Sequence, residues 1–204
     1  MKRNQRQVVY IGVRTNVVLS NCYTRMVQRV FCRRIFICSI GNPEPQYEGT
    51  RHNVGNYLME SIINHWKLHL KPEGPNTWRL NKYPIVLFKS TNSYMNLLGS
   101  PVVSSFKKSR EKDMLVLHDE LQRSPGKYQI RQAGTSNRGH NGLKSIEKYL
   151  GTSNYSKVLI GIGRPTDDDV VSWVMSKFHD DELHQIDRIV PTIISELEKR
   201  YCVI

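Results

Sequence analysis

Four short apolar runs, separated by amphipathic stretches, constrain the fold of this chain more than any other feature of its sequence. The runs lie at residues 35–40, 84–88, 114–117 and 157–162. Each run has the length and composition of a buried strand. Strands that alternate with helical patterns are typical of parallel sheets joined by crossover helices. The sequence therefore predicts one α/β domain, in which a twisted mixed β-sheet is flanked by helices.

The stretches between the runs carry helical periodicity. Apolar residues recur every four positions from Val54 to Trp66, which predicts a helix over residues 53–67. Polar and apolar residues alternate over residues 127–131, which predicts an edge or antiparallel strand. Three further helices are expected, at residues 97–106, 143–150 and 183–197.

Composition supports a folded chain that does not enter a membrane. The 204 residues are 39% hydrophobic and 24% charged, which is enough apolar material for one core. No apolar stretch approaches the roughly 18 residues that a spanning helix needs, so we expect no membrane insertion. The four cysteines show neither a CxxC spacing nor the density of a disulfide-rich domain. We expect reduced thiols and no zinc site.

Positive charge is concentrated at the N-terminus. The net charge is +12, and eight of the 30 Lys and Arg residues lie in residues 1–34, which hold no Asp or Glu. An Arg-rich, acid-free segment with interleaved apolar and hydroxyl residues is typical of a mitochondrial targeting segment. A disordered basic arm, or an extension that is never translated, is the alternative, and the location would then be cytoplasmic. We expect residues 35–204 to form the folded domain, and the net charge of +12 favours an acidic partner such as nucleic acid or an anionic surface.

Polar residues follow the expected strands at the points where ligands bind in α/β proteins. Ligands of open α/β sheets bind at the carboxyl ends of the strands. Polar clusters at or near these ends contain Asn42, His52, Asn96, Asp119 and Asn141. We expect these clusters to meet in one cleft.

Five segments of the sequence resemble bacterial-type peptidyl-tRNA hydrolase. They occur in the same order as in that family, and the resemblance runs from about residue 35 to about residue 190. The segments are IGNPEPQYEGTRHNVG (40–55), NSYMNLLG (92–99), VLHDELQRSPGK (116–127), RGHNGLKSIEKYLGT (138–152) and IGIGRP (160–165). The resemblance implies a monomeric, single-domain α/β enzyme that needs no metal or cofactor. It also implies that the enzyme cleaves the ester between a peptide and the 3′ ribose of tRNA. Together with the basic leader, it suggests a fungal or other eukaryotic member in the mitochondrial matrix.

The resemblance assigns catalysis to a histidine and a carboxylate. His52 matches the family's catalytic histidine, and Asp119 matches the carboxylate that orients it. An imidazole has an ordinary pKa of about 6.5, which suits a general base that deprotonates water. Because the pattern contains no serine nucleophile, we expect direct attack by water without an acyl-enzyme.

The resemblance also implies residues that contact the substrate. Asn96 and Asn141 match family asparagines near the catalytic histidine, and a side-chain amide can donate to the oxyanion of the tetrahedral intermediate. Asn42 matches an asparagine that distinguishes a peptide-bearing amine from a free one. Tyr47 and Tyr94 match aromatic or hydroxyl-bearing contacts to the end of the tRNA.

The resemblance also bears on phosphate contacts and on one residue that differs from the family pattern. Four basic residues around the expected cleft are candidate phosphate contacts for the tRNA acceptor stem: Lys127, Arg131, Arg138 and Lys144. Arg138 stands where the family usually has glycine, which puts the shape of that loop in question. We expect no DNA partner. A non-catalytic organellar RNA-binding or processing factor on the same fold is the competing hypothesis.

Overall fold

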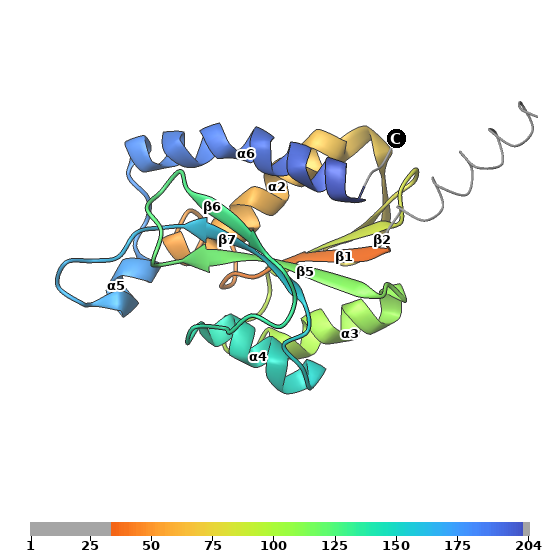
Figure 1. The fold of residues 1–204 in the computed structure, drawn as a ribbon, viewed down its shortest axis with the longest axis horizontal. Helices are drawn as coiled ribbons and strands as arrows, with labels where there is room; N and C mark the ends of the chain where they lie inside the picture. Colours follow the sequence, from red (N-terminus) through yellow and green to blue (C-terminus); the bar gives the residue numbers. More distant parts are fainter. Residues whose placement is uncertain (1–33, 202–204) are drawn as a thin grey trace, which may run out of the picture.

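Seven strands form one mixed sheet in the computed structural model, which describes residues 34–201 (Figure 1). The strand order is β2-β3-β4-β1-β5-β7-β6. The four central strands run parallel, whereas the β2–β3 hairpin and β6 pair antiparallel at the two edges. The strands are β1 (Ile35–Ser39), β2 (Leu70–Gly74), β3 (Thr77–Leu80), β4 (Ile85–Lys89), β5 (Asp113–Glu120), β6 (Tyr128–Arg131) and β7 (Ser156–Gly161).

Helices cover both faces of this sheet (Figure 1). Helices α2 (Val54–Trp66) and α6 (Asp180–Tyr201) cover one face, and α3 (Gly99–Ser109) and α4 (Asn141–Leu150) cover the other. The remaining elements are two 3-10 turns, η1 (Arg51–Asn53) and η2 (Lys67–His69), and the short helix α5 (Val170–Met175).

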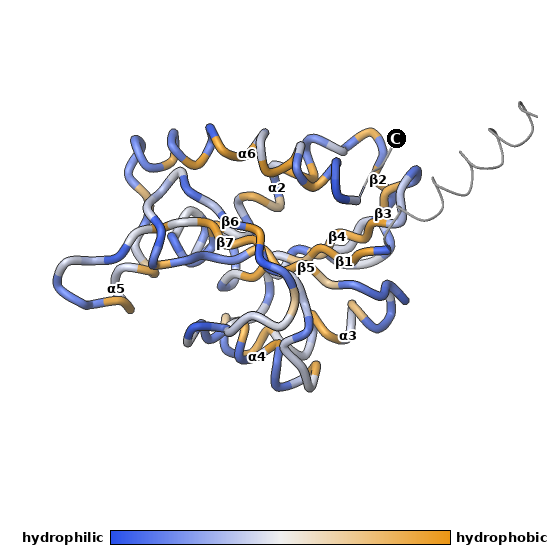
Figure 2. Tube along the Cα trace, viewed as in Figure 1, coloured by the Kyte–Doolittle hydropathy of each residue, from blue (hydrophilic) through white to orange (hydrophobic). Residues whose placement is uncertain are grey.

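The sheet separates two apolar cores because successive side chains of a strand point to opposite faces. In β1, Ile35 and Ile37 join the core beneath α2 and α6, whereas Phe36 and Cys38 join the core beneath α3 and α4. Figure 2 shows hydrophobic residues concentrated along the central strands. Burial on both faces explains why these strands are continuous apolar runs in the sequence rather than alternating patterns.

Two glycines allow the close packing that places the site. A Cβ on Gly55, near the start of α2, would lie 2.4 Å from the carbonyl oxygen of Leu117 in β5. A Cβ on Gly99 would lie 2.1 Å from the carbonyl oxygen of Ser145, and this is the contact that brings α3 against α4. Neither position accepts a larger residue without moving backbone.

The predicted α/β fold is confirmed, and the structure adds helix α5 and the β2–β3 hairpin and extends β5. The β2–β3 hairpin was missed because β2 is mostly exposed, β3 is mostly half-buried, and neither has an apolar pattern. β5 continues through residues 118–120, which we had expected to follow the strand. These polar residues stay in the sheet because Glu120 still pairs with Gly161 of β7.

The expected targeting segment lies almost entirely outside the described residues. Residues 1–33 and 202–204 are not described, so the interpretation of residues 1–34 rests on composition. Within residues 34–201, no helix combines the length and the apolar character that a membrane crossing requires.

Candidate active site

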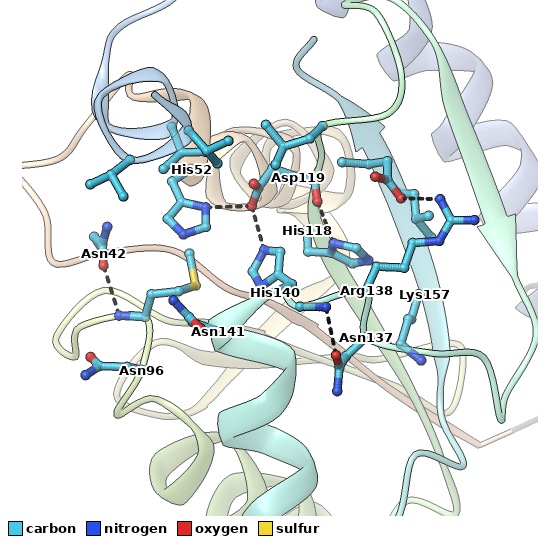
Figure 3. A pocket seen from close by; sticks show the side chains of 18 of the residues that line it. Asn42, His52, Asn96, His118, Asp119, Asn137, Arg138, His140, Asn141 and Lys157 are labelled. Carbon is cyan, nitrogen blue, oxygen red and sulfur yellow. Dashed lines mark hydrogen bonds and ion pairs between the residues drawn. The ribbon is translucent and has the colours of Figure 1, made fainter. Parts of the chain in front are cut away.

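The polar clusters do meet in one cleft, with a volume of about 530 Å³, at the carboxyl ends of the central parallel strands. The cleft also extends past His140 toward β6 and β7, and α5 forms an apolar part of its wall (Figure 3). Eight of the residues expected at the site line the cleft: Asn42, His52, Tyr94, Asn96, Asp119, Arg131, Arg138 and Asn141.

Three expected contact residues lie outside the cleft lining. Lys127 and Lys144 are exposed on the surface. Tyr47 is half-buried, and its ring meets the ring of Tyr94 nearly edge-on, with 6.1 Å between the centroids. Tyr47 therefore contacts the cleft through Tyr94, which lines it, and is not itself part of the lining.

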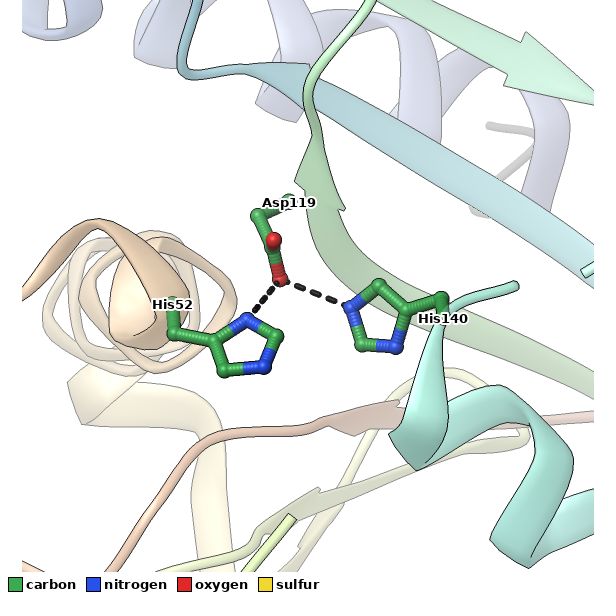
Figure 4. A group of neighbouring side chains, drawn as sticks. All are labelled: His52, Asp119 and His140. Carbon is green, nitrogen blue, oxygen red and sulfur yellow. Dashed lines mark hydrogen bonds and ion pairs between the residues drawn. The ribbon is translucent and has the colours of Figure 1, made fainter. Parts of the chain in front are cut away.

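His52 and Asp119 are hydrogen-bonded although 67 residues separate them in the chain. His52 sits in the 3-10 turn η1, and its Nδ1 lies 2.9 Å from Oδ1 of Asp119 near the end of β5 (Figure 4). Asp119 is 4% exposed, and its ionised carboxylate can only accept. Nδ1 of His52 therefore carries the proton. Nε2 makes no hydrogen bond to the described residues, so its lone pair is available to a ligand in the cleft.

A second histidine, His140, shares the same carboxylate oxygen. Its Nε2 lies 2.8 Å from Oδ1 of Asp119 (Figure 4). Its Nδ1 accepts the backbone N–H of Gly142 at 3.1 Å, which caps helix α4. A backbone N–H can only donate, so this contact fixes His140 as the Nε2–H tautomer. Both of its ring nitrogens are occupied, so of the two histidines bound to Asp119 only His52 has a ring nitrogen that is free to act as a base.

The opposing charges shift the pKa values of the pair in opposite directions. Burial works against the charged form of His52, but the charge and hydrogen bond of Asp119 outweigh it and raise the pKa of the imidazole above its ordinary value of 6.5. Burial also works against the charged form of Asp119, which alone would raise its pKa. His52 and His140 outweigh this effect and hold the pKa of Asp119 well below its usual range. Asp119 is thus ionised at neutral pH, where it stabilises a proton on His52.

His118, the residue before Asp119, contributes no charge to the site. Burial, reinforced by His140, lowers the pKa of His118 to about 3. Its Nδ1–H donates to the carbonyl oxygen of Asp119 at 2.7 Å. A neutral ring at this place does not compete with His52 for the carboxylate.

The asparagines of the cleft differ in how firmly they are held. Asn42 is 5% exposed, and its Oδ1 accepts the backbone N–H of Met95 at 2.9 Å (Figure 3). Its backbone also exchanges two hydrogen bonds with the side chain of Asn53, the last residue of η1. Asn96 and Asn141 are exposed, and within residues 34–201 their side chains make no hydrogen bond.

The ligand-type atoms of His52, Asp119 and His140 lie within 4.8 Å of one another, a spacing that also suits a metal ion. A metal-bound histidine donates its second ring N–H to an acceptor. Nδ1 of His140 faces a backbone N–H donor instead, so its Nε2 cannot bind a metal while the helix cap is kept. The cluster therefore fits a hydrogen-bond network better than a metal site.

Sequence reasoning named His52 and Asp119 but gave His140 no direct role. The structure places His140 on the same oxygen atom as His52. Its position next to Asn141 in the RGHNG segment was the available signal. Arg138 has a left-handed φ of 49°, a backbone conformation that glycine adopts more readily than arginine.

An imidazole oriented by a buried carboxylate, in a cleft at the carboxyl edge of an α/β sheet, defines a class of enzymes that activate water by general-base catalysis. Comparison with known proteins agrees and is more specific. The family model "Peptidyl-tRNA hydrolase" matches residues 36–202. The chain belongs to the peptidyl-tRNA hydrolase family.

Relatives and solved structures support this assignment over most of the chain. The peptidyl-tRNA hydrolase of Lactobacillus gasseri is 36% identical over 156 residues, which cover 74% of this chain and 84% of the relative. That of Variovorax paradoxus is 35% identical over 160 residues, covering 71% of each chain. The crystal structure of the Acinetobacter baumannii peptidyl-tRNA hydrolase superposes with a TM-score of 0.70 at 25% identity, covering 84% of this chain and 89% of that chain.

Proposed function

We propose that this protein is a peptidyl-tRNA hydrolase that releases a peptide from tRNA by cleaving the ester at the 3′ ribose. The family membership supports the substrate class. The observation that carries the mechanism is the hydrogen bond from Nδ1 of His52 to Asp119, which leaves Nε2 unpaired in the cleft.

The reaction needs one water molecule and one shuttled proton. Nε2 of His52 takes a proton from water while the water oxygen attacks the ester carbonyl carbon. The tetrahedral intermediate then breaks the bond between this carbon and the 3′ oxygen, which takes the proton from the imidazolium of His52. Asp119 stabilises the imidazolium in between. The products are a peptide with a free carboxyl group and a tRNA with a free 3′ hydroxyl.

The three asparagines take different parts in this scheme. Asn96 and Asn141 have free amide groups at the cleft, which suits donation to the oxyanion of the intermediate. Asn42 is held rigidly, with its Nδ2 aimed at Sδ of Met175, 3.5 Å away. We assign to Asn42 the contact with the peptide backbone, through which a peptide is distinguished from a free amino group.

Contacts to the tRNA are divided between the cleft and the surface. Arg131 and Arg138 line the cleft, and Arg138 lies on the side away from His52 (Figure 3). Tyr94 is 49% exposed at the mouth, where its face is available for stacking on a base. Lys127 and Lys144 are exposed nearby and suit phosphates of the acceptor stem.

Hydrolysis by the purified full-length chain tests this function against RNA binding alone. We expect cleavage of peptidyl-tRNA and not of the matching free aminoacyl-tRNA. His52→Ala should abolish turnover and retain tRNA binding. Equal binding of both RNAs without turnover by the wild-type chain would instead identify a non-catalytic RNA-binding factor.

We further propose that the protein is a eukaryotic member that works in the mitochondrial matrix. The support is the acid-free, Arg-rich composition of residues 1–34. A fluorescent reporter fused behind these residues should accumulate in mitochondria of a fungal or animal cell. A cytosolic signal would contradict this location.

We also propose that the protein acts as a monomer, because a single chain supplies every residue of the cleft described above. Light scattering across the working concentration range should give the mass of one chain. A dimeric mass at these concentrations would overturn this proposal.

A further inference from the structure

The turn η1 carries more than the histidine, because each of its three residues holds a different wall of the cleft. His52 binds Asp119 of β5, and Asn53 binds the backbone of Asn42 after β1. Arg51 reaches the third wall, which consists of α5 and the segment that joins it to α6.

Arg51 is 1% exposed, and all three nitrogens of its guanidinium have partners. Nη1 and Nη2 bind the two carboxylate oxygens of Glu182 at 2.8 and 2.7 Å, near the start of α6. Nε donates to Oγ of Ser176 at 3.2 Å, and the backbone N–H donates to the carbonyl oxygen of Ser176. The guanidinium carbon also lies 3.8 Å from the ring centroid of Trp173 and 4.9 Å from that of Phe178.

Helix α5 needs such an anchor because it has little core of its own. It is six residues long, and none of its side chains is fully buried. Four of its residues nevertheless line the cleft: Val170, Val171, Val174 and Met175. Trp173 points away from the cleft lining, onto Arg51 and the carbonyl oxygen of Gly163. The contacts of Trp173 therefore help to hold this apolar wall from the side that faces away from the cleft.

We infer that Arg51 is a positioning residue for the hydrolytic site, which fixes the α5 wall and the turn that presents His52 as one unit. The inference rests on the function proposed for His52. A lysine cannot replace this arginine, since an ammonium offers no planar fork for a carboxylate and no flat face for an indole ring. Loss of the fork frees both the wall and the turn, and displacement of catalytic groups by about 1 Å can cost on the order of 100-fold in rate.

Arg51→Lys and Glu182→Gln in the full-length chain test this inference. The matched control is Arg79→Lys. Nη1 of Arg79 binds Glu111 at 2.7 Å, and the side chain of Glu111 is completely buried. Glu111 lies just before the start of β5, whereas Asp119 lies near its other end. The control therefore perturbs an arginine–carboxylate pair at the opposite end of β5 from Asp119, the partner of His52.

Two readouts separate positioning from a merely structural role. The first is kcat and KM on peptidyl-tRNA below the unfolding temperature of every variant. The second is the NMR signal of the ring Nδ1–H proton of His52, which the hydrogen bond to Asp119 protects from exchange with water. We expect Arg51→Lys to lower kcat/KM about 10- to 100-fold and to broaden this signal. Glu182→Gln should act in the same direction more weakly, and it replaces Arg51→Lys if that variant does not fold.

Arg79→Lys should lower Tm and leave both readouts unchanged. If Arg51→Lys and Glu182→Gln lower Tm but retain the wild-type kcat/KM and a sharp His52 signal, the inference is wrong. Failure of the proposed function looks different, because the wild-type chain and Arg79→Lys would then also lack hydrolysis. The NMR signal would still decide whether Arg51 positions His52.

Discussion

The floor and the rim of the cleft are built in different ways. On the floor, Asn42, His52, Asp119 and His140 are bound to one another or to backbone groups before any substrate arrives. At the rim, Tyr94, Asn96, Asn141 and Arg138 are exposed. The floor groups are therefore fixed before the substrate arrives, whereas the rim groups have free polar atoms whose partners the substrate supplies.

The floor is costly to build and sensitive to change. A buried carboxylate is tolerated only when its lost hydration is replaced, and Asp119 receives two imidazole donors on one oxygen. Removing one partner leaves charge that is buried and poorly compensated. Changes to the floor should therefore lower rate and stability together, whereas changes to the rim should alter turnover or tRNA binding without loss of stability.

The largest effect is expected from His52→Ala on the floor. Loss of the general base should lower kcat on peptidyl-tRNA by about 10³- to 10⁴-fold, in the upper part of the range for such groups. Tyr94 and the basic residues are untouched, so the Kd for tRNA should stay within a few-fold of wild type. A variant that keeps more than a tenth of the wild-type kcat would show that another group is the base.

Asp119→Asn should come next, at about 10²- to 10³-fold in kcat/KM, because an amide neither fixes the tautomer of His52 nor stabilises its proton. The same change makes a pH prediction. Wild-type activity should rise as His52 loses its proton, around a pKa above 6.5, because Asp119 raises that pKa. In Asp119→Asn the acidic limb of the profile should move to lower pH. An unmoved limb would contradict the assignment.

Asn96→Ala and Asn141→Ala on the rim should each lower kcat by about 10²-fold, as expected for the loss of one oxyanion donor. Since both side chains are exposed and make no hydrogen bond to the described residues, their free energy of unfolding should change by less than about 0.5 kcal/mol. Asn42→Ala is the floor counterpart, and it should lower Tm as well as activity. If all three variants lose the same stability, the distinction between a fixed floor and a free rim is wrong.

The smallest effect is expected from Arg138→Gly. Glycine suits the left-handed backbone at φ 49° and should stabilise the loop by about 1 kcal/mol. The exposed ion pair with Glu120, at 3.3 Å, offsets little of this gain. Affinity for tRNA should fall a few-fold. The slope of log affinity against log salt concentration should become shallower by about one, as expected when one phosphate contact is lost. An unchanged salt slope would show that Arg138 does not contact phosphate.

Sequence patterns predicted the central strands and the main helices, and the resemblance implied that Asp119 pairs with His52. Strands buried on both faces are continuous apolar runs, and the carboxyl-end rule brings Asp119 into reach of the loop that carries His52. The resemblance then gave each polar residue its expected role.

What the sequence left out depends on geometry that no periodicity encodes. The tautomer of His140 follows from one backbone N–H at the start of α4, and a single residue shift of that helix would remove it. Arg51 is buried against residues more than 120 positions away, although its residue type predicts a surface. The β2–β3 hairpin was not predicted because β2 is mostly exposed and β3 is mostly half-buried.

The titration of the His52 ring, followed by ¹⁵N NMR alongside the pH profile of kcat/KM, addresses the general-base assignment most directly. The account predicts that Nδ1 stays protonated throughout, that Nε2 titrates with a pKa above 6.5, and that activity rises with the same pKa. If Nδ1 is the nitrogen that loses its proton, or if activity follows a group that titrates separately from His52, the assignment of His52 as the general base is wrong.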